Sequence, residues 1–183
     1  MKNKIIKLLM LIVFVSGIYS CEEYLSESDP NLLSNDSYWR DLRDTESGLT
    51  ATYASLLNHY VLNVVSEGCR ADMGWPGYGR PSPNGSGPIE FYYHTYTATT
   101  NQLARKWQAL YLGIFRANQV IHGLNNIEEQ ITEEKMEEWK IQMGQARFLR
   151  GLFHFYAYHT YNNGSIIIRD ELALTQEKFN ESL

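Results

Sequence analysis

One segment between residues 67 and 100 concentrates flat aromatic rings beside charged side chains, glycines and prolines. Sugar rings present apolar C–H faces and polar rims, so exposed aromatic rings next to polar side chains suit an oligosaccharide. Trp75, Tyr78 and Tyr92 are the best stacking candidates, and Arg80 is a candidate polar partner. Four prolines restrict the backbone and would hold such rings in place. We predict that this long irregular loop supplies ligand contacts.

Two other roles for the same segment remain open. Residues 91–96 could pack on the core as a short strand, which would leave their rings only half exposed. Alternatively, two of Glu67, Asp72 and Glu90 could form the acid–base pair of a glycosidase. Surface carboxylates are common and no motif positions these three, so the sequence predicts no catalytic residue.

No cofactor or metal motif accompanies these residues. His154 and His159 are five positions apart, whereas a helical zinc pair needs a spacing of four. We therefore expect both to be core histidines. Gly77-Tyr78-Gly79 lacks the lysine and hydroxyl residue of a phosphate-binding loop. The sequence predicts neither a metal site nor a cofactor.

The amino terminus has the layout of a secretory signal. Three lysines precede an apolar run at residues 8–15, which is too short to span a bilayer as a permanent helix. The following Ile18-Tyr19-Ser20-Cys21 is similar to a bacterial lipobox, in which cleavage precedes the cysteine that carries the lipid. We predict a lipoprotein signal peptide at 1–20, lipidation of Cys21 and a lipidated tether at 21–37. The alternative is an ordinary secretory peptide followed by a disulfide-bonded cysteine.

Cysteine usage and charge agree with a lipid anchor. Cys69 is the only cysteine besides Cys21, so lipidation of Cys21 rules out a disulfide framework and Cys69 should be a small buried residue. Removal of three N-terminal lysines changes the formal net charge from −5 to −8. An acidic protein argues against nucleic acid as a partner and against electrostatic membrane adhesion. We therefore expect the acyl chains to hold the protein on the membrane.

The first helix that positions the aromatic loop is expected at about 45–61. Asp44 is the candidate N-cap, because a carboxylate there accepts from free backbone N–H groups. The apolar face at helical spacing comprises Leu49, Tyr53, Leu56, Leu57 and Tyr60.

Two longer helices are expected at about 101–124 and 133–161, with Thr132 as N-cap of the latter. A short connection predicts antiparallel packing. Asn118 lies on the apolar stripe and should bond a neighbouring backbone, because an unpaired buried amide costs roughly 1–3 kcal/mol. Arg150 should likewise pair with acids or carbonyls. The shared core should contain Trp107, Tyr111, Ile114, Leu149 and Phe153.

The segment 144–161 is apolar on two opposite stripes, which predicts an inner helix buried on several sides. One stripe contains Ala146, Leu149, Arg150, Phe153 and Ala157, and the other contains Phe148, Leu152, Phe155 and Tyr156.

These helices resemble the SusD/RagB family of outer-membrane nutrient-binding lipoproteins of Bacteroidetes. The resemblance is carried by Trp107-x3-Tyr111-x2-Ile114-x3-Asn118 and by Ala146-Arg147-Phe148-Leu149-Arg150 followed by Phe153. The chain departs from the family after the last helix, where Tyr161-Asn162-Asn163-Gly164 keeps a glycine turn but lacks the usual proline.

The resemblance implies an all-α fold of tetratricopeptide-like helical pairs with a long irregular loop. It also implies that residues 38–183 are the N-terminal part of a truncated SusD-like domain with exposed apolar helix faces. The expected function is non-enzymatic: an outer-membrane lipoprotein, facing the cell exterior, binds oligosaccharide or peptide nutrients and delivers them to a TonB-dependent transporter of the SusC type. A surface glycoside hydrolase and a truncated remnant without a ligand are the alternatives.

Overall fold

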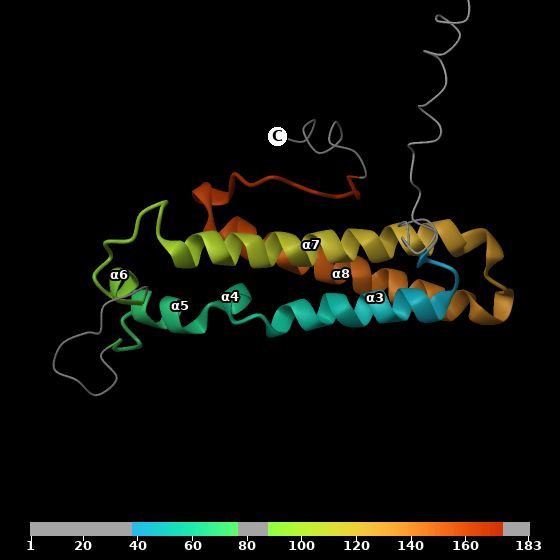
Figure 1. The fold of residues 1–183 in the computed structure, drawn as a ribbon, viewed down its shortest axis with the longest axis horizontal. Coiled ribbons are helices and arrows are strands. Elements are labelled where there is room, and N and C mark those ends of the chain that lie inside the picture. Colours follow the sequence, from blue (N-terminus) through green and yellow to red (C-terminus); the bar gives the residue numbers. More distant parts are fainter. Residues whose placement is uncertain (1–37, 77–87, 174–183) are drawn as a thin grey trace, which may run out of the picture. The chain divides into compact units, whose positions relative to one another are not determined.

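The computed structural model describes residues 38–76 and 88–173. The predicted signal peptide, tether and lipidated Cys21 lie outside the described residues, as do Tyr78 and Arg80. The described residues are mainly helical and contain no strand, so the all-α prediction is confirmed (Figure 1).

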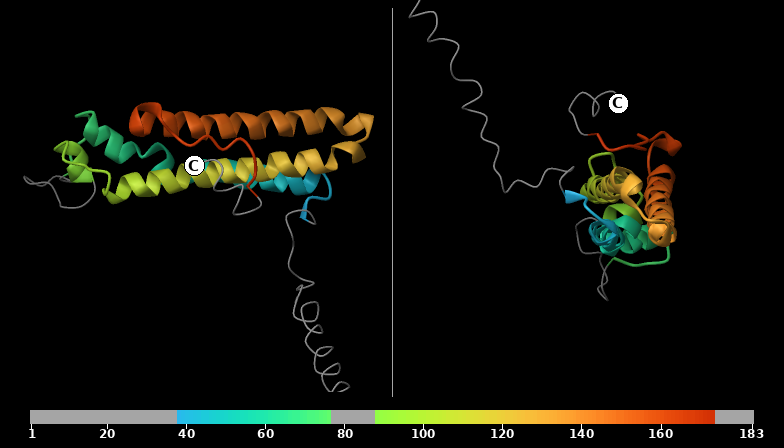
Figure 2. Two further views of the ribbon diagram at one scale, coloured as in Figure 1. Left: turned by 90° about the horizontal axis from the view of Figure 1, so that it is seen from above. Right: turned by 90° about the vertical axis from the view of Figure 1, so that its right-hand side faces the viewer.

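Three helices form the body of the described region. α7 and α8 run antiparallel, joined by a short connection, and α3 lies against both (Figure 2). Four of the α-helices are α3 (Leu42–Ala54), α4 (His59–Leu62), α5 (Val64–Arg70) and α6 (Pro88–Tyr92). The two long ones are α7 (Asn101–Ile127) and α8 (Met136–Thr160). Short 3₁₀ turns occupy Ser55–Leu57, Glu128–Gln130, Glu133–Lys135 and Asn162–Gly164.

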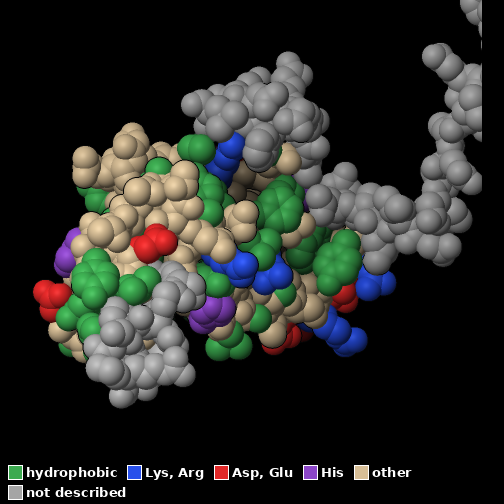
Figure 3. Space-filling view, turned by 60° about the vertical axis from the view of Figure 1, so that its left-hand side comes forward, with side chains coloured by type: hydrophobic (Ala, Val, Ile, Leu, Met, Phe, Trp, Pro, Cys, Tyr) green, Lys and Arg blue, Asp and Glu red, His purple; other side chains and the backbone are tan. Residues whose placement is uncertain are grey.

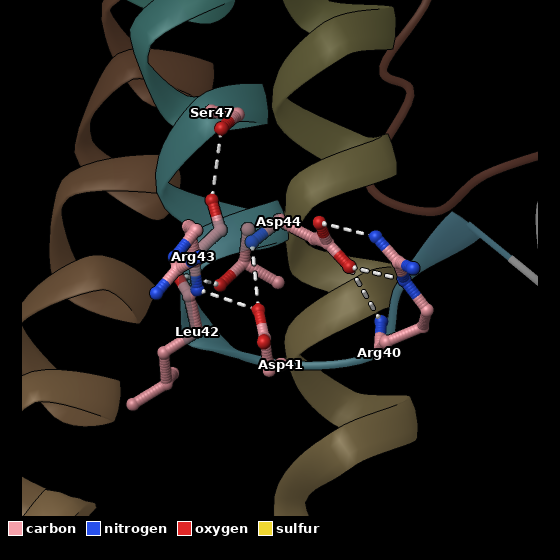
Figure 4. A network of polar contacts seen from close by, with 7 residues as sticks. Arg40, Asp41, Leu42, Arg43, Asp44 and Ser47 are labelled. Atoms are coloured by element: carbon pink, nitrogen blue, oxygen red, sulfur yellow. Dashed lines mark hydrogen bonds and ion pairs between the residues drawn. The ribbon is translucent and has the colours of Figure 1, made fainter.

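The first turn of α3 is capped by Asp41, so the prediction that Asp44 is the N-cap is wrong. The Asp41 carboxylate accepts from the backbone N–H groups of Arg43, at 2.9 Å, and Asp44, at 3.1 Å (Figure 4). Asp44 instead forms an ion pair with Arg40, with 2.9 Å between Nε and Oδ2. The extended backbone of Asp41 aims its carboxylate at the free N–H groups, whereas Asp44 already belongs to the helix.

The expected helix at 45–61 is interrupted. α3 ends at Ala54, and Asn58 has an extended backbone and caps α4 by accepting from Tyr60 N–H at 3.0 Å. Asn63 then takes a left-handed conformation, with φ of 49°, and separates α4 from α5. Leu57 lies in the 3₁₀ turn that follows α3, outside the regular helical spacing, and it is 86% exposed. Tyr53 on α3 is also exposed. Neither residue therefore joins the expected apolar face.

The core between α7 and α8 contains Ile114, Leu149 and Phe153, each no more than 1% exposed, as predicted. Tyr111 is only partly buried and packs against this core from its edge, and Trp107 is also only partly buried, which corrects that part of the prediction. α8 is also tied to α7 by a side chain, since Trp139 donates its indole N–H to the Leu124 carbonyl at 2.9 Å. These contacts hold α7 and α8 together along their shared face.

A buried polar contact joins α3 to α8. The amide of Gln142 donates to the Leu42 carbonyl at 3.1 Å and accepts from the Thr45 hydroxyl at 2.6 Å. Both ends of the buried amide are therefore satisfied, as the cost of an unpaired amide requires.

The outer face of α8 differs from the expectation of burial on several sides. Phe148 and Phe155 are 65% and 54% exposed, and Ile141 and Tyr158 are exposed beside them. α8 thus buries one stripe against α3 and α7 and leaves an apolar face open, which agrees with the expectation of exposed apolar faces. Within the described part of the chain, no helix combines the length and apolarity needed to cross a membrane.

Candidate functional site

An aromatic cluster forms where α5 and α6 meet. Trp75 follows α5 and Tyr92 ends α6, and their ring centroids are 4.9 Å apart with an interplanar angle of 81°. Tyr93 contacts Tyr92 edge-on at 5.3 Å. The structure therefore brings together two of the four residues predicted to bind a ligand and adds Tyr93 to them.

The cluster is open to solvent. Trp75 is 44% and Tyr93 54% exposed, whereas Tyr92 is partly buried between them. In the space-filling view, green side chains gather at the lower left, over the end of the unit that carries α5 and α6 (Figure 3). Exposed rings of this kind can stack on the apolar face of a ligand.

Phe91 anchors the cluster to the protein interior. It is 2% exposed and stacks on Tyr96, with centroids 5.0 Å apart and an interplanar angle of 15°. The expected alternative, a strand at 91–96, is wrong, because α6 ends at Tyr92 and the residues from 93 to 96 form a turn followed by irregular chain. Packing on the interior is correct for Phe91, which is buried. The sequence reasoning did not select Tyr93, and the run Phe91-Tyr92-Tyr93 was the available signal.

Charged side chains attach the same end of the unit to α7. The Glu67 carboxylate accepts from Lys106 Nζ at 3.0 Å and from Arg70 Nη2 at 2.5 Å. Lys106 is buried, whereas the Glu67 side chain is partly exposed. Burial raises the pKa of Glu67, but the hydrogen bonds and charges of Lys106 and Arg70 outweigh it and hold the pKa below its usual value. Glu67 is therefore an ionised structural link between α5 and α7.

Glu90 has a comparable role for α6. The Thr100 hydroxyl donates to Glu90 Oε2 at 2.5 Å, immediately before α7 begins. The Glu90 carbonyl also accepts from the Thr95 N–H at 2.8 Å. Two of the carboxylates considered for acid–base chemistry thus hold the aromatic cluster in place, and Asp72 is exposed in a left-handed turn.

The polar residues of the long helices have structural partners. The Asn118 amide donates to the carbonyls of Arg169 and Glu171 at 3.1 and 3.0 Å, which confirms its predicted backbone-bonding role. Arg150 donates to the Asn118 side-chain oxygen at 3.0 Å and to the Asp170 carbonyl, so its predicted structural pairing is confirmed. Both residues attach the segment after α8 to the helix pair.

The remaining candidates separate into buried and exposed groups. Cys69 is buried with a free thiol, as expected, and burial raises its pKa. His154 is partly buried, but His159 is exposed, so the prediction of a core histidine is wrong for His159. The described residues contain no group of three or more His, Cys, Asp or Glu side chains that could hold a metal ion.

Comparison with known protein families supplies one match. Residues 82–178 match a SusD-like family model described as starch-binding and associating with the outer membrane. Comparison with curated proteins and with solved structures gave no match. The matched region includes the end of the aromatic segment and both long helices, and it exceeds half of the 183-residue chain. The chain therefore belongs to the SusD-like family, whose members are starch-binding proteins associated with the outer membrane.

Proposed function

We propose that this protein is a surface lipoprotein of the outer membrane that binds oligosaccharides and delivers them to a TonB-dependent transporter of the SusC type. Membership of the SusD-like family supports the membrane location and the carbohydrate ligand. The observation that carries the proposal is the exposed aromatic cluster of Trp75, Tyr92 and Tyr93 at one end of the helical unit.

The geometry of the cluster suits a pyranose ring. Trp75 and Tyr92 stand nearly at right angles, so a sugar can lie flat on one ring while its edge contacts the other. The Glu67–Lys106 pair and the Glu90–Thr100 hydrogen bond attach the supporting helices to α7. A platform held in this way loses little conformational entropy when the ligand binds.

Tyr78 and Arg80 would complete the site from the segment between Trp75 and α6. Arg80 could donate hydrogen bonds to sugar hydroxyls or to a peptide carbonyl. A peptide ligand would need an apolar or aromatic side chain to occupy the cluster, and a peptide with such a side chain is titrated beside the oligosaccharides in the test below.

Calorimetry on the whole chain tests the cluster. Trp75→Ala and Tyr92→Ala should each weaken binding of malto-oligosaccharides by about 1 kcal/mol or more, because each removes a stacking surface. Phe155→Ala is the matched control, since it removes an aromatic ring of similar exposure from α8. Circular dichroism should show the same helical signal in every variant.

Two results would contradict the proposal. Unchanged affinity in a triple variant with alanine at Trp75, Tyr78 and Tyr92 would show that the ligand is bound outside this segment. Turnover of the malto-oligosaccharides by the wild-type chain would instead favour a glycoside hydrolase.

A further inference from the structure

A groove of about 730 Å³ lies between the beginning of α7 and the chain that follows α8. Its size is within the range of small-molecule sites, about 300–1,000 Å³. None of the roles assigned above uses it. The side chains that matter for the argument are Leu103, Trp107, Tyr161, Asn162, Ser165 and Ile166.

The aromatic wall of the groove is held rigidly. Trp107 stacks on Tyr111, with ring centroids 4.3 Å apart, and meets the ring of Tyr161 edge-on at 5.0 Å. The Tyr111 hydroxyl donates to the Ile167 carbonyl, and the Tyr161 hydroxyl donates to the Leu103 carbonyl, both at 2.6 Å. Two anchored tyrosines therefore fix the orientation of the indole before any ligand arrives.

The rim of the groove offers polar groups that make no hydrogen bond within the described part of the chain. The Asn162 amide nitrogen donates to the Ser165 carbonyl at 3.2 Å. The Asn162 side-chain oxygen, the Ser165 hydroxyl and the Trp107 indole N–H have no hydrogen-bond partner among the described residues. These groups provide an acceptor and two donors next to an aromatic wall.

The lining also limits the charge of a ligand. The groove residues are aliphatic, aromatic, hydroxyl or amide side chains, and none of them is ionised. A charged ligand would lose its hydration there without gaining a counter-charge. An uncharged ligand with one apolar face and several hydroxyl groups matches both the wall and the rim.

We propose that this groove is a second carbohydrate subsite that binds a neutral pyranose unit, with Trp107 as the stacking wall and Asn162 and Ser165 as hydrogen-bonding partners. The inference rests on the proposed oligosaccharide-binding function and extends it from one contact region to two. It also gives Trp107 a binding role, whereas the sequence suggested only a core role.

The two subsites are close enough for one ligand. Ala98 lines the groove and Tyr92 belongs to the aromatic cluster, and the six residues from one to the other span at most about 22 Å. A long oligosaccharide that touches both regions binds the second one intramolecularly, which raises its affinity without a new contact at the first. The wild-type chain should therefore prefer longer glucans.

Calorimetry with maltoheptaose and maltotriose on the whole chain tests the groove. An Asn162→Ala, Ser165→Ala double variant removes the rim groups at two exposed positions, and Ala98→Trp fills the groove. Each should weaken maltoheptaose binding at least about fivefold and reduce the preference for maltoheptaose over maltotriose. Ala51→Trp, an equal enlargement at an exposed position on α3, should change neither quantity.

Tryptophan fluorescence supplies an independent measurement. In a Trp75→Phe background, maltoheptaose should protect from acrylamide quenching the part of the fluorescence that Trp107→Phe removes. This protection should disappear in the Asn162→Ala, Ser165→Ala variant. Thermal melting of each variant confirms that it is folded. If Ala98→Trp does not fold, the Asn162→Ala, Ser165→Ala variant still tests the groove.

The outcomes separate this inference from the proposed function. The groove subsite is overturned if both groove variants keep the wild-type affinity and glucan-length preference while Trp75→Ala loses affinity. The proposed function would then still stand. If only the groove variants lose affinity for maltoheptaose, the groove subsite is supported and the aromatic cluster does not contact the ligand. Failure of the wild-type chain to bind either glucan would overturn both.

Discussion

At the residue scale, glycines in the long helices have opposite roles that depend on their neighbours. A Cβ atom on Gly113 would lie 2.6 Å from the Phe153 ring, so this glycine permits the close approach of α7 and α8. A Cβ atom on Gly151, in contrast, would meet nothing within 4 Å. The two residues therefore provide a matched pair for testing the packing.

We expect Gly113→Ala to lower the free energy of unfolding by roughly 1–3 kcal/mol, because the added methyl group overpacks the core. Gly151→Ala should raise it by about 0.5–1 kcal/mol, because alanine restricts the unfolded chain at an open helical position. Urea denaturation of both variants measures the difference. Equal effects of the same sign would contradict the close contact between Gly113 and Phe153.

Phenylalanines on α8 give a second contrast at the residue scale. Phe153 is fully buried, and Phe153→Ala should cost about 3–5 kcal/mol of unfolding free energy through lost burial and a cavity. Phe155 is 54% exposed, so Phe155→Ala should cost much less. A similar loss in both variants, measured by chemical denaturation, would show that the second stripe of α8 is buried as well.

At the scale of elements, His154 links α8 to the segment that follows it. Its Nδ1 lies 2.9 Å from the Arg150 carbonyl, and its Nε2 lies 3.1 Å from the backbone N–H of Arg169. The Arg169 N–H can only donate, so Nε2 must accept and Nδ1 must carry the proton. The neutral ring therefore makes both bonds, whereas the protonated ring would lose the one to Arg169.

Acid should therefore weaken this attachment. Burial lowers the pKa of His154, and this effect outweighs the hydrogen bond to the Arg150 carbonyl, which raises it. The charge of the Arg150 guanidinium lowers the pKa as well, and the charge of the Asp170 carboxylate raises it. Because the unfolded state then binds the proton more tightly, the stability contribution is complete above the ordinary value of 6.5 and declines as the pH falls below it. The melting temperature should fall accordingly between pH 7 and 5.

His154→Gln should reduce this pH dependence, and His159→Gln is the control because His159 is exposed on the same helix. Amide hydrogen exchange at Arg169 gives a local measurement, since loss of the Nε2 acceptor should speed its exchange at low pH. Equal pH profiles for wild type and His154→Gln would exclude the histidine as the cause.

At the scale of the whole molecule, membrane attachment is predicted to depend on Cys21. Cys21→Ala should release the protein from the membrane or block its processing, because the acyl chains would be lost. Metabolic labelling with a lipid precursor and membrane fractionation measure both effects. Absence of label on the wild-type protein would contradict the lipoprotein prediction, and Cys69→Ala should leave the label unchanged.

Much of the architecture could be predicted because it follows from local periodicity. The 3.6-residue spacing of apolar side chains located both long helices, and the short connection between them indicated antiparallel packing. The partnership of Asn118 followed from the cost of burying an amide. The prediction of one helix at 45–61 was wrong, because Asn58 has an extended backbone and Asn63 a left-handed one. These conformations depend on local contacts as well as on composition.

The sequence by itself determined the family, the helical class and the aromatic content of the candidate site, because these depend on residue type and spacing along the chain. Only the tertiary structure decided which rings meet. It shows that Trp75 contacts Tyr92 and that Glu67 and Glu90 have structural partners. It also shows that Trp107, expected in the core, lines a groove. These outcomes depend on how separate helices pack against one another, and spacing within one helix carries no information about the rotation and contacts of its neighbours.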